Sequence, residues 1–125
     1  MKVHVFFVQN DLTNQETKVI TDGIGLLNGH HLLYQEDHTK AKHAVTFSAE
    51  EIILERTADV SSRTVLRNGK IGECVVKSVY GEMHFTTRLH SKEMNDDGWR
   101  IYYAIFLGQE QVSEMELVWK FEKLA

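Results

Sequence analysis

Apolar and polar side chains alternate over most of residues 80–121, and this alternation constrains the fold more than any other feature of the sequence. Successive side chains of a β-strand point to opposite faces of a sheet, so a repeat of two residues predicts strands with one apolar face. The odd-numbered positions form the apolar row, which comprises Met83, Phe85, Leu89, Trp99, Ile101, Tyr103, Ile105, Met115, Leu117, Trp119 and Phe121. We expect three antiparallel strands here, with the core packed against their odd-numbered side.

The same row predicts how these three strands pair. The first turn is rich in Asn, Asp and Gly, and a turn about residue 97 would place Leu89 opposite Ile105. A second turn centred on residue 109 would place Trp99 opposite Trp119. Both registers keep apolar side chains beside one another, whereas a slip of one residue would set apolar against charged positions.

The rest of the chain shows further short strands separated by turn signals. Asn-Gly pairs at positions 28–29 and 68–69 predict tight hairpins, and glycines inside a long strand predict bends. The remaining strands are expected at Val3–Val8, Gln15–Leu27, His30–Asp37, Lys42–Ser48, Glu51–Thr57, Arg63–Arg67 and Lys70–Lys77. Strands joined in chain order by tight hairpins predict an all-β fold, a single antiparallel up-and-down barrel of about eight to ten strands over residues 1–125.

Composition narrows the classes of protein to which this chain can belong. Its 125 residues suit one domain, and the net charge of -4, with basic residues interleaved among acidic ones, argues against nucleic acid as a partner. The sequence contains no run of about 18 apolar residues, so no membrane-spanning segment is predicted. The N-terminus lacks the pattern of a signal peptide, and the single cysteine, Cys74, has no internal partner for a disulfide. We therefore expect a cytoplasmic protein without membrane association.

The second half of the chain resembles a known family. The match runs from Ile52 to Phe121 and is carried by Arg56, Gly69 and the run Tyr80–Thr87, which fits an aromatic-Gly-Glu-apolar-x-apolar-x-Thr pattern. On these residues the chain is similar to the YwiB-like family, small bacterial proteins of unknown function with a lipocalin-like (calycin) β-barrel. The resemblance implies such a barrel and an intracellular setting, and it transfers no catalytic residue.

Several polar residues share strand faces with apolar ones and so are candidates for the interior of the barrel. A barrel of about eight strands is either filled by side chains or holds one small ligand. Polar groups converging in an apolar cavity are typical of a small-molecule site. The candidate ligand-binding residues are Tyr34, Glu36, Arg56, Thr87, Trp99, Tyr103 and Trp119. Two alternatives stay open, a plainly packed core and a pairing of Glu36 with Arg56 that simply satisfies both.

Metal and nucleophile chemistry have weaker support. Four histidines cluster in sequence, His30, His31, His38 and His43, but their spacing matches no metal motif. The hairpin at 68–69 would place Arg63 opposite Cys74, where a cation could lower the pKa of the thiol; a small buried apolar residue is the alternative. No catalytic motif and no cofactor-binding motif appears, so no catalytic residue, metal ligand or cofactor is assigned.

Three classes of function follow. The first is a non-enzymatic, cytoplasmic barrel that binds a small amphipathic molecule inside, which a solid interior would contradict. The second is a protein-interaction or homodimerisation module that uses the outer sheet face, where Phe106, Val112 and Val118 interrupt polar positions. The third is an enzyme, which convergence of Arg56, Glu36 and a histidine in one cleft would favour.

Overall fold

The structure is a computed structural model that describes residues 1–124, and these contain ten β-strands and no helix. The strands are β1 (Lys2–Asp11), β2 (Glu16–Asn28), β3 (His31–Gln35), β4 (Lys42–Phe47), β5 (Glu51–Thr57), β6 (Ser61–Arg67), β7 (Lys70–Ser78), β8 (Gly81–Asn95), β9 (Gly98–Leu107) and β10 (Glu110–Lys123). Strand positions agree with the expected segments to within a few residues. No helix among residues 1–124 is long and apolar enough to cross a membrane.

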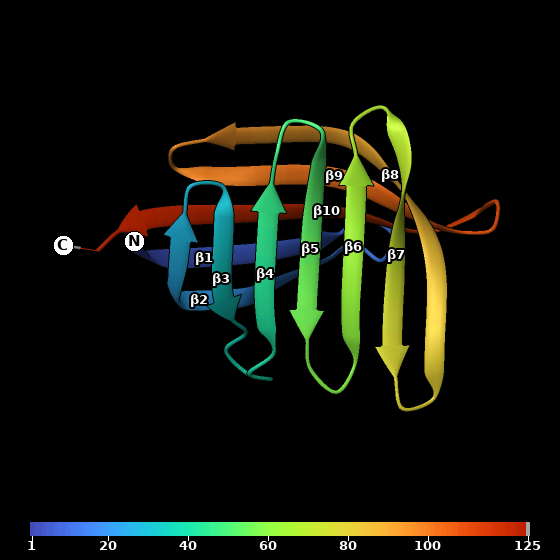
Figure 1. Cartoon of the computed structure of the whole chain (residues 1–125), viewed down its shortest axis with the longest axis horizontal. Coiled ribbons are helices and arrows are strands. Elements are labelled where there is room, and N and C mark those ends of the chain that lie inside the picture. The colour runs from blue at the N-terminus through green and yellow to red at the C-terminus, as the bar shows by residue number, and fades with distance from the viewer. Residues whose placement is uncertain (125) are drawn as a thin grey trace.

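The strands close into one barrel. Each strand pairs antiparallel with its neighbours in the chain, and β1 pairs with β10 to complete the ring. The predicted up-and-down barrel is therefore confirmed. In Figure 1, β3 to β7 run upright in front of β1, β9 and β10, which run nearly perpendicular to them, so the barrel is flattened into two crossed layers.

Two of the three longest strands, β8 and β2, turn the corners between the layers. The ladder of β8 with β9 shifts between Leu89 and Ser91, and the ladder of β1 with β2 shifts between Phe7 and Val8. An extra residue in one strand bends it and increases its twist, which lets β8 and β2 pass from one layer to the other. Figure 1 shows β8 leaving the front layer at its right-hand end and continuing behind it.

The predicted apolar row forms most of the core. Trp99, Ile101, Tyr103, Met115, Leu117, Trp119 and Phe121 are buried, and they pack with residues of β1, β3, β4 and β5. Met83 is the exception, because 54% of it is exposed. The segment Gly81–Phe85 pairs with β7 but extends beyond β9, so Met83 lies in a part of β8 with a neighbouring strand on one side only.

One of the two predicted registers is correct. Trp99 lies opposite Trp119 as expected. Leu89, however, lies opposite Tyr103 and not Ile105, so the register of β8 with β9 was wrong. The turn between them is tighter than expected, and the bulge in β8 shifts the ladder by one further residue.

Candidate functional site

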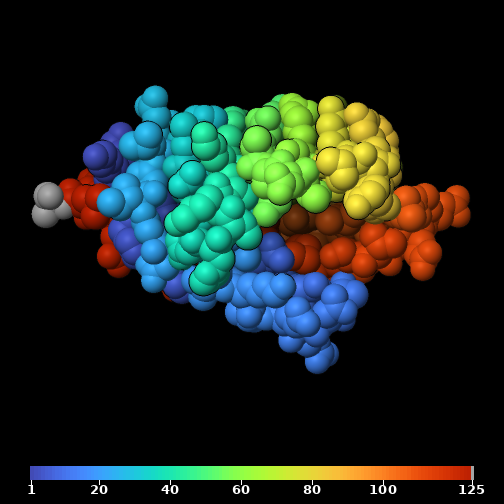
Figure 2. Space-filling model, turned by 90° about the horizontal axis from the view of Figure 1, so that it is seen from below, coloured from blue at the N-terminus to red at the C-terminus, as the bar shows by residue number. Residues whose placement is uncertain are grey.

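A cavity opens into the barrel from one end. Its volume is about 130 Å³, and its apolar walls include Phe7, Leu54, Leu117 and Trp119. Figure 2 views the molecule from that end and shows a hollow between the green and yellow front layer and the blue and orange back layer. The interior is therefore not solid at this end, since one water needs only about 10–15 Å³ of such space.

A chain of hydrogen bonds crosses the barrel at one wall of this cavity. Trp119, on β10 in the back layer, donates its indole N–H to the Tyr34 hydroxyl on β3, with 3.0 Å between Nε1 and the oxygen. The Tyr34 hydroxyl lies 3.3 Å from Nδ1 of His43 on β4, and the two rings stack with centroids 4.8 Å apart. The inward side chains of three strands are thus joined into one network.

The network ends in an ion pair at the mouth of the cavity. Nε2 of His43 lies 2.7 Å from Oε1 of Glu36, and Nε of Arg56 donates to the same oxygen at 2.8 Å. Arg56 also donates through Nη1 to the carbonyl oxygen of Val60 at 2.9 Å, and Thr39 donates to the second carboxylate oxygen of Glu36. Every polar atom of this carboxylate therefore has a partner, which a group only 13% exposed requires.

The contacts determine the protonation states of the network. Burial alone would raise the pKa of Glu36, but hydrogen bonds from Arg56, Thr39 and His43 outweigh it and lower that pKa to about 2. Burial lowers the pKa of His43, against the raising effect of Glu36. Glu36 is therefore an anion at neutral pH and His43 is neutral, donating from Nε2–H to Glu36 and accepting the Tyr34 O–H at Nδ1. Burial also raises the pKa of Tyr34 and keeps it protonated.

Besides Thr64, which donates to Cys74, three uncharged polar groups line the cavity outside this network. Tyr103 points inward from β9 and is only 6% exposed, yet its hydroxyl makes no hydrogen bond to any residue between 1 and 124. The side chains of Gln9 and Ser62 also line the cavity and have no partner among those residues. No buried side-chain nitrogen or oxygen of residues 1–124 lacks a partner, so the Tyr103 hydroxyl reaches the open space of the cavity, where a water or a ligand can bond to it.

The sequence-predicted site residues divide into two groups. The structure joins Tyr34, Glu36, Arg56 and Trp119 in the network and places Tyr103 in the same cavity. The other two lie outside the cavity. Trp99 packs in the core, with its ring 5.1 Å from that of Phe47, and Thr87 is buried and donates to the carbonyl oxygen of Val65 at 2.7 Å. Their surroundings indicate a role in packing and in holding β8 against β6.

His43 is the site residue that the sequence interpretation misplaced, because it was grouped with its histidine neighbours in sequence. The face alternation of residues 41–47 does distinguish it, since His43 shares its face with buried Ala41, Val45 and Phe47. No group of three or more His, Cys, Asp or Glu side chains within residues 1–124 is arranged to hold a metal ion.

The expected pairing of Cys74 with Arg63 is wrong. The ladder of β6 with β7 shifts between Val65 and Arg67, and Thr64 therefore lies opposite Cys74. The Thr64 hydroxyl donates to the sulfur at 3.3 Å, and burial raises the pKa of the thiol. The alternative interpretation of Cys74 as a small buried residue agrees with this environment.

The outer face proposed for protein contacts is only partly exposed. Val112 is exposed at the shift in the β9–β10 ladder, whereas Phe106 and Val118 are half-buried. The three residues lie on β9 and β10 as expected.

Comparisons with known proteins agree on the family and the fold. The family described as a domain of unknown function (DUF1934) matches residues 3–118. The chain is similar to the crystal structure of the ywiB protein from Bacillus subtilis, with a TM-score of 0.64 and 21% sequence identity over 98% of this chain and 91% of that one. No curated protein matches the sequence.

Proposed function

Because this chain belongs to the DUF1934 family, whose description leaves the function open, we propose its function from the barrel itself. It is a non-enzymatic binding protein that holds a small, uncharged amphipathic molecule in the interior cavity. The observation that carries the proposal is the Tyr103 hydroxyl, which opens on an apolar cavity and makes no hydrogen bond to another of residues 1–124. A ligand with a hydroxyl or amide group would supply a partner.

The size of the cavity limits the ligand. Pockets for drug-sized molecules measure roughly 300–1,000 Å³, whereas a cavity of roughly 150 Å³ holds a benzene molecule. A volume of about 130 Å³ therefore suits a single small ring or a short branched chain, or the apolar end of a longer molecule.

The charges at the mouth of the cavity indicate an uncharged ligand. Arg56 is neutralised by Glu36 and further bonded to the Val60 carbonyl, so it has little capacity to bind an anion. Glu55 also lines the cavity but is exposed to solvent, and Gln9, Ser62 and Tyr103 remain as donors and acceptors without charge. The walls between them are apolar, which suits a molecule with one polar end.

The convergence of Glu36, Arg56 and His43 meets the geometric condition set above for an enzyme, but the bonds within it argue against catalysis. Both ring nitrogens of His43 are bonded to protein groups, so neither is free to move a proton of a substrate. Tyr34 is buried and keeps its proton. We assign these residues to holding the shape of the cavity.

We also propose a cytoplasmic location. It is supported by Cys74, the one cysteine of the chain, which is a free, buried thiol as expected in a reducing compartment.

Two experiments test the binding proposal. Native mass spectrometry of protein purified from its own host should show a small bound molecule. Independently, phenol and toluene are titrated while the amide and indole NMR signals are followed. Both probes should give saturable shifts that include the Trp119 indole, and Leu54→Trp, which fills the cavity, should abolish them.

Tyr103→Phe provides the matched control. It should weaken phenol binding about fivefold, as expected for one lost hydrogen bond of about 1 kcal/mol, and leave toluene binding unchanged. Absence of saturable shifts with either probe, or shifts that persist in Leu54→Trp, would refute the proposal.

A further inference from the structure

The barrel leaves one sheet edge open in the front layer. β8 pairs with β7 from Gly81 to Arg88, but its ladder with β9 begins only at Thr86. The segment Gly81–Phe85 therefore has a neighbouring strand on one side only. Figure 1 shows it at the right-hand end of the front layer, with no strand of that layer beyond it. An unpaired edge is a template for another strand.

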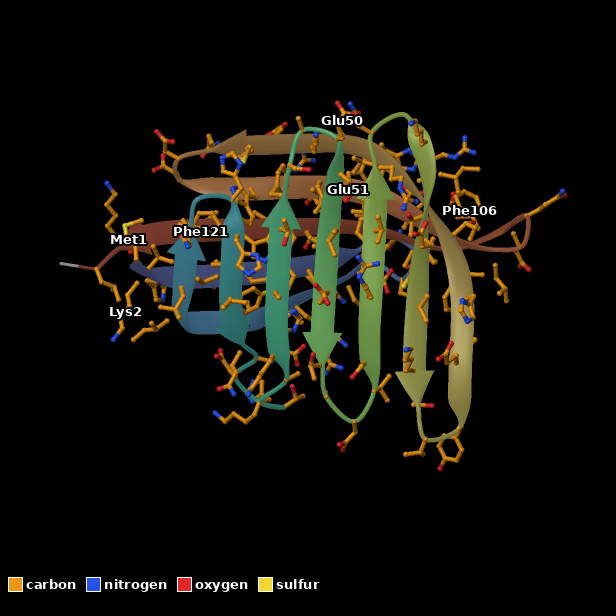
Figure 3. The ribbon with its side chains drawn as sticks, viewed as in Figure 1. Met1, Lys2, Glu50, Glu51, Phe106 and Phe121 are labelled. Atoms are coloured by element: carbon orange, nitrogen blue, oxygen red, sulfur yellow. The ribbon has the colours of Figure 1, made fainter. Side chains whose placement is uncertain are left out.

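The register determines which backbone groups face this edge. The β7–β8 hairpin closes at Ser78 and Gly81, and bonded and non-bonded pairs alternate along an antiparallel ladder. Met83 therefore directs its backbone N–H and C=O to β7, whereas Glu82 and His84 direct theirs to the open edge. The pairing of β9 agrees, because Thr86, the next residue in that series, faces Phe106 (labelled in Figure 3 beside the bend of β8).

Apolar side chains are exposed around the same edge. Val79 and Tyr80 in the hairpin turn are 89% and 96% exposed, and Met83 is 54% exposed. Met83 continues the inner apolar row of β8 and lies opposite Val76 of β7. A strand added at this edge would cover Met83 from the side that β9 leaves open.

We propose that this edge pairs with the same edge of a second copy of the chain. The two β8 strands run antiparallel about a two-fold axis, with Met83 opposite Met83 of the second copy. Glu82 then lies opposite His84 of the second copy, and His84 opposite its Glu82. These two residues carry all the backbone groups that face the edge, and each such pair exchanges both backbone hydrogen bonds.

Charge complementarity selects both the partner and the register. Only alternate residues direct their backbone groups to the edge, and these must face one another for the two strands to bond. The two-fold axis must therefore pass beside a single residue of the edge and not between two residues. Centring on Glu82 would set two carboxylates opposite each other, and centring on His84 would pair Glu82 with Thr86, whose edge β9 already occupies. Centring on Met83 sets a carboxylate opposite an imidazole twice and an apolar side chain opposite its own copy. The segment is its own complement only in this register.

The mass in solution tests the proposal. In a concentration series followed by analytical ultracentrifugation, the wild-type protein should reach twice the 14.4 kDa of one chain. Met83→Lys and Met83→Glu each place two like charges opposite each other across the two-fold axis. Each variant alone should therefore remain at the mass of one chain. An equimolar mixture of the two should recover the doubled mass, because lysine then faces glutamate.

Two further variants separate the edge from other surfaces. His84→Pro removes an edge donor that β7 does not use and should prevent dimerisation, whereas His84→Ala keeps the donor and should retain most of it. Ile24→Lys changes an exposed apolar residue on β2 and should leave the dimer intact.

Three results would overturn the inference. They are a wild-type protein that stays at the mass of one chain at every concentration, a dimer that persists in Met83→Lys, and a mixture of the Lys and Glu variants that stays monomeric. Folding of each variant is checked by circular dichroism, and recovery in the mixture shows directly that both are folded.

Discussion

Replacement of Glu36 by glutamine tests the central ion pair of the barrel. The carboxylate is bonded by Arg56, His43 and Thr39, and its pKa is lowered from 4.5 to about 2. One unit of pKa corresponds to 1.36 kcal/mol, so the pair stabilises the folded protein by about 3 kcal/mol above pH 5. Because the side chain is only 13% exposed, screening by solvent reduces this value little.

The sign of the pH dependence follows from the direction of the shift. A group whose folded pKa is lowered contributes stability that is present above its unfolded pKa and is lost as the pH falls through the folded value. We therefore expect Glu36→Gln to cost about 3 kcal/mol at pH 7 and about half of that at pH 3. The difference should fall to a few tenths of a kcal/mol, about RT ln 2, near pH 2, where about half of the wild-type carboxylate is protonated.

Urea unfolding at pH 7, 5, 4 and 3, followed by tryptophan fluorescence, measures this difference. Glu50→Gln is the matched control, because Glu50 is exposed in the β4–β5 turn (labelled in Figure 3) and its carboxylate makes no ion pair among residues 1–124. The comparison is repeated in His43→Gln, which removes the titration of the imidazole beside Glu36. A cost of Glu36→Gln that is no larger than that of Glu50→Gln, or that stays constant from pH 7 to pH 3, would refute the reasoning.

Three further outcomes are expected. Tyr34→Phe should lower the free energy of unfolding in urea by about 1–3 kcal/mol, because it leaves two buried partners without a bond; a change below about 0.5 kcal/mol would contradict the hydrogen-bond chain. Gly72→Ala should lower the free energy of unfolding by about 3 kcal/mol, since the added Cβ would lie 2.0 Å from the backbone carbonyl oxygen of Val65. Gly23→Ala, the control, should be tolerated, and equal costs for the two variants would argue against this packing. Cys74 should react with a thiol reagent much more slowly in the folded protein than in urea, and equal rates would show that the thiol is not buried.

The alternation of side chains was sufficient to predict the fold because almost every strand obeys it. Each inward row repeats every two residues, and each hairpin joins strands that are adjacent in the sheet, so chain order gives the topology directly. The register was less predictable. The expected partner of Cys74 is wrong because a bulge adds a residue between the turn and the strand. The expected partner of Leu89 is wrong because of a similar bulge together with a tighter turn. A bulge changes register without changing composition.

The candidate site was predictable as a set of inward positions but not as a network. Face alternation put Tyr34, Glu36 and Arg56 inside, and the structure confirms the ion pair that was left open as an alternative. The link through His43 depends on which strands lie side by side across the barrel, and no local pattern contains that information. Met83 was placed in the core by the same alternation, because the sequence does not show that β8 extends past the end of β9.

The hydrogen-bond network lies where the backbone ladder is weakest, and this position accounts for a costly ion pair inside a small barrel. β2 and β3 pair only over Leu26, Leu27 and Asn28, so the ring has few backbone hydrogen bonds at this seam. Trp119, on the back layer, donates across the barrel to Tyr34, on the front layer next to the seam. The remaining bonds continue along the front layer from β3 to β4 and β5. Side-chain bonds thus tie β3 to the back layer beside this seam, and the cavity keeps its shape because its wall is held by directional contacts as well as by apolar packing.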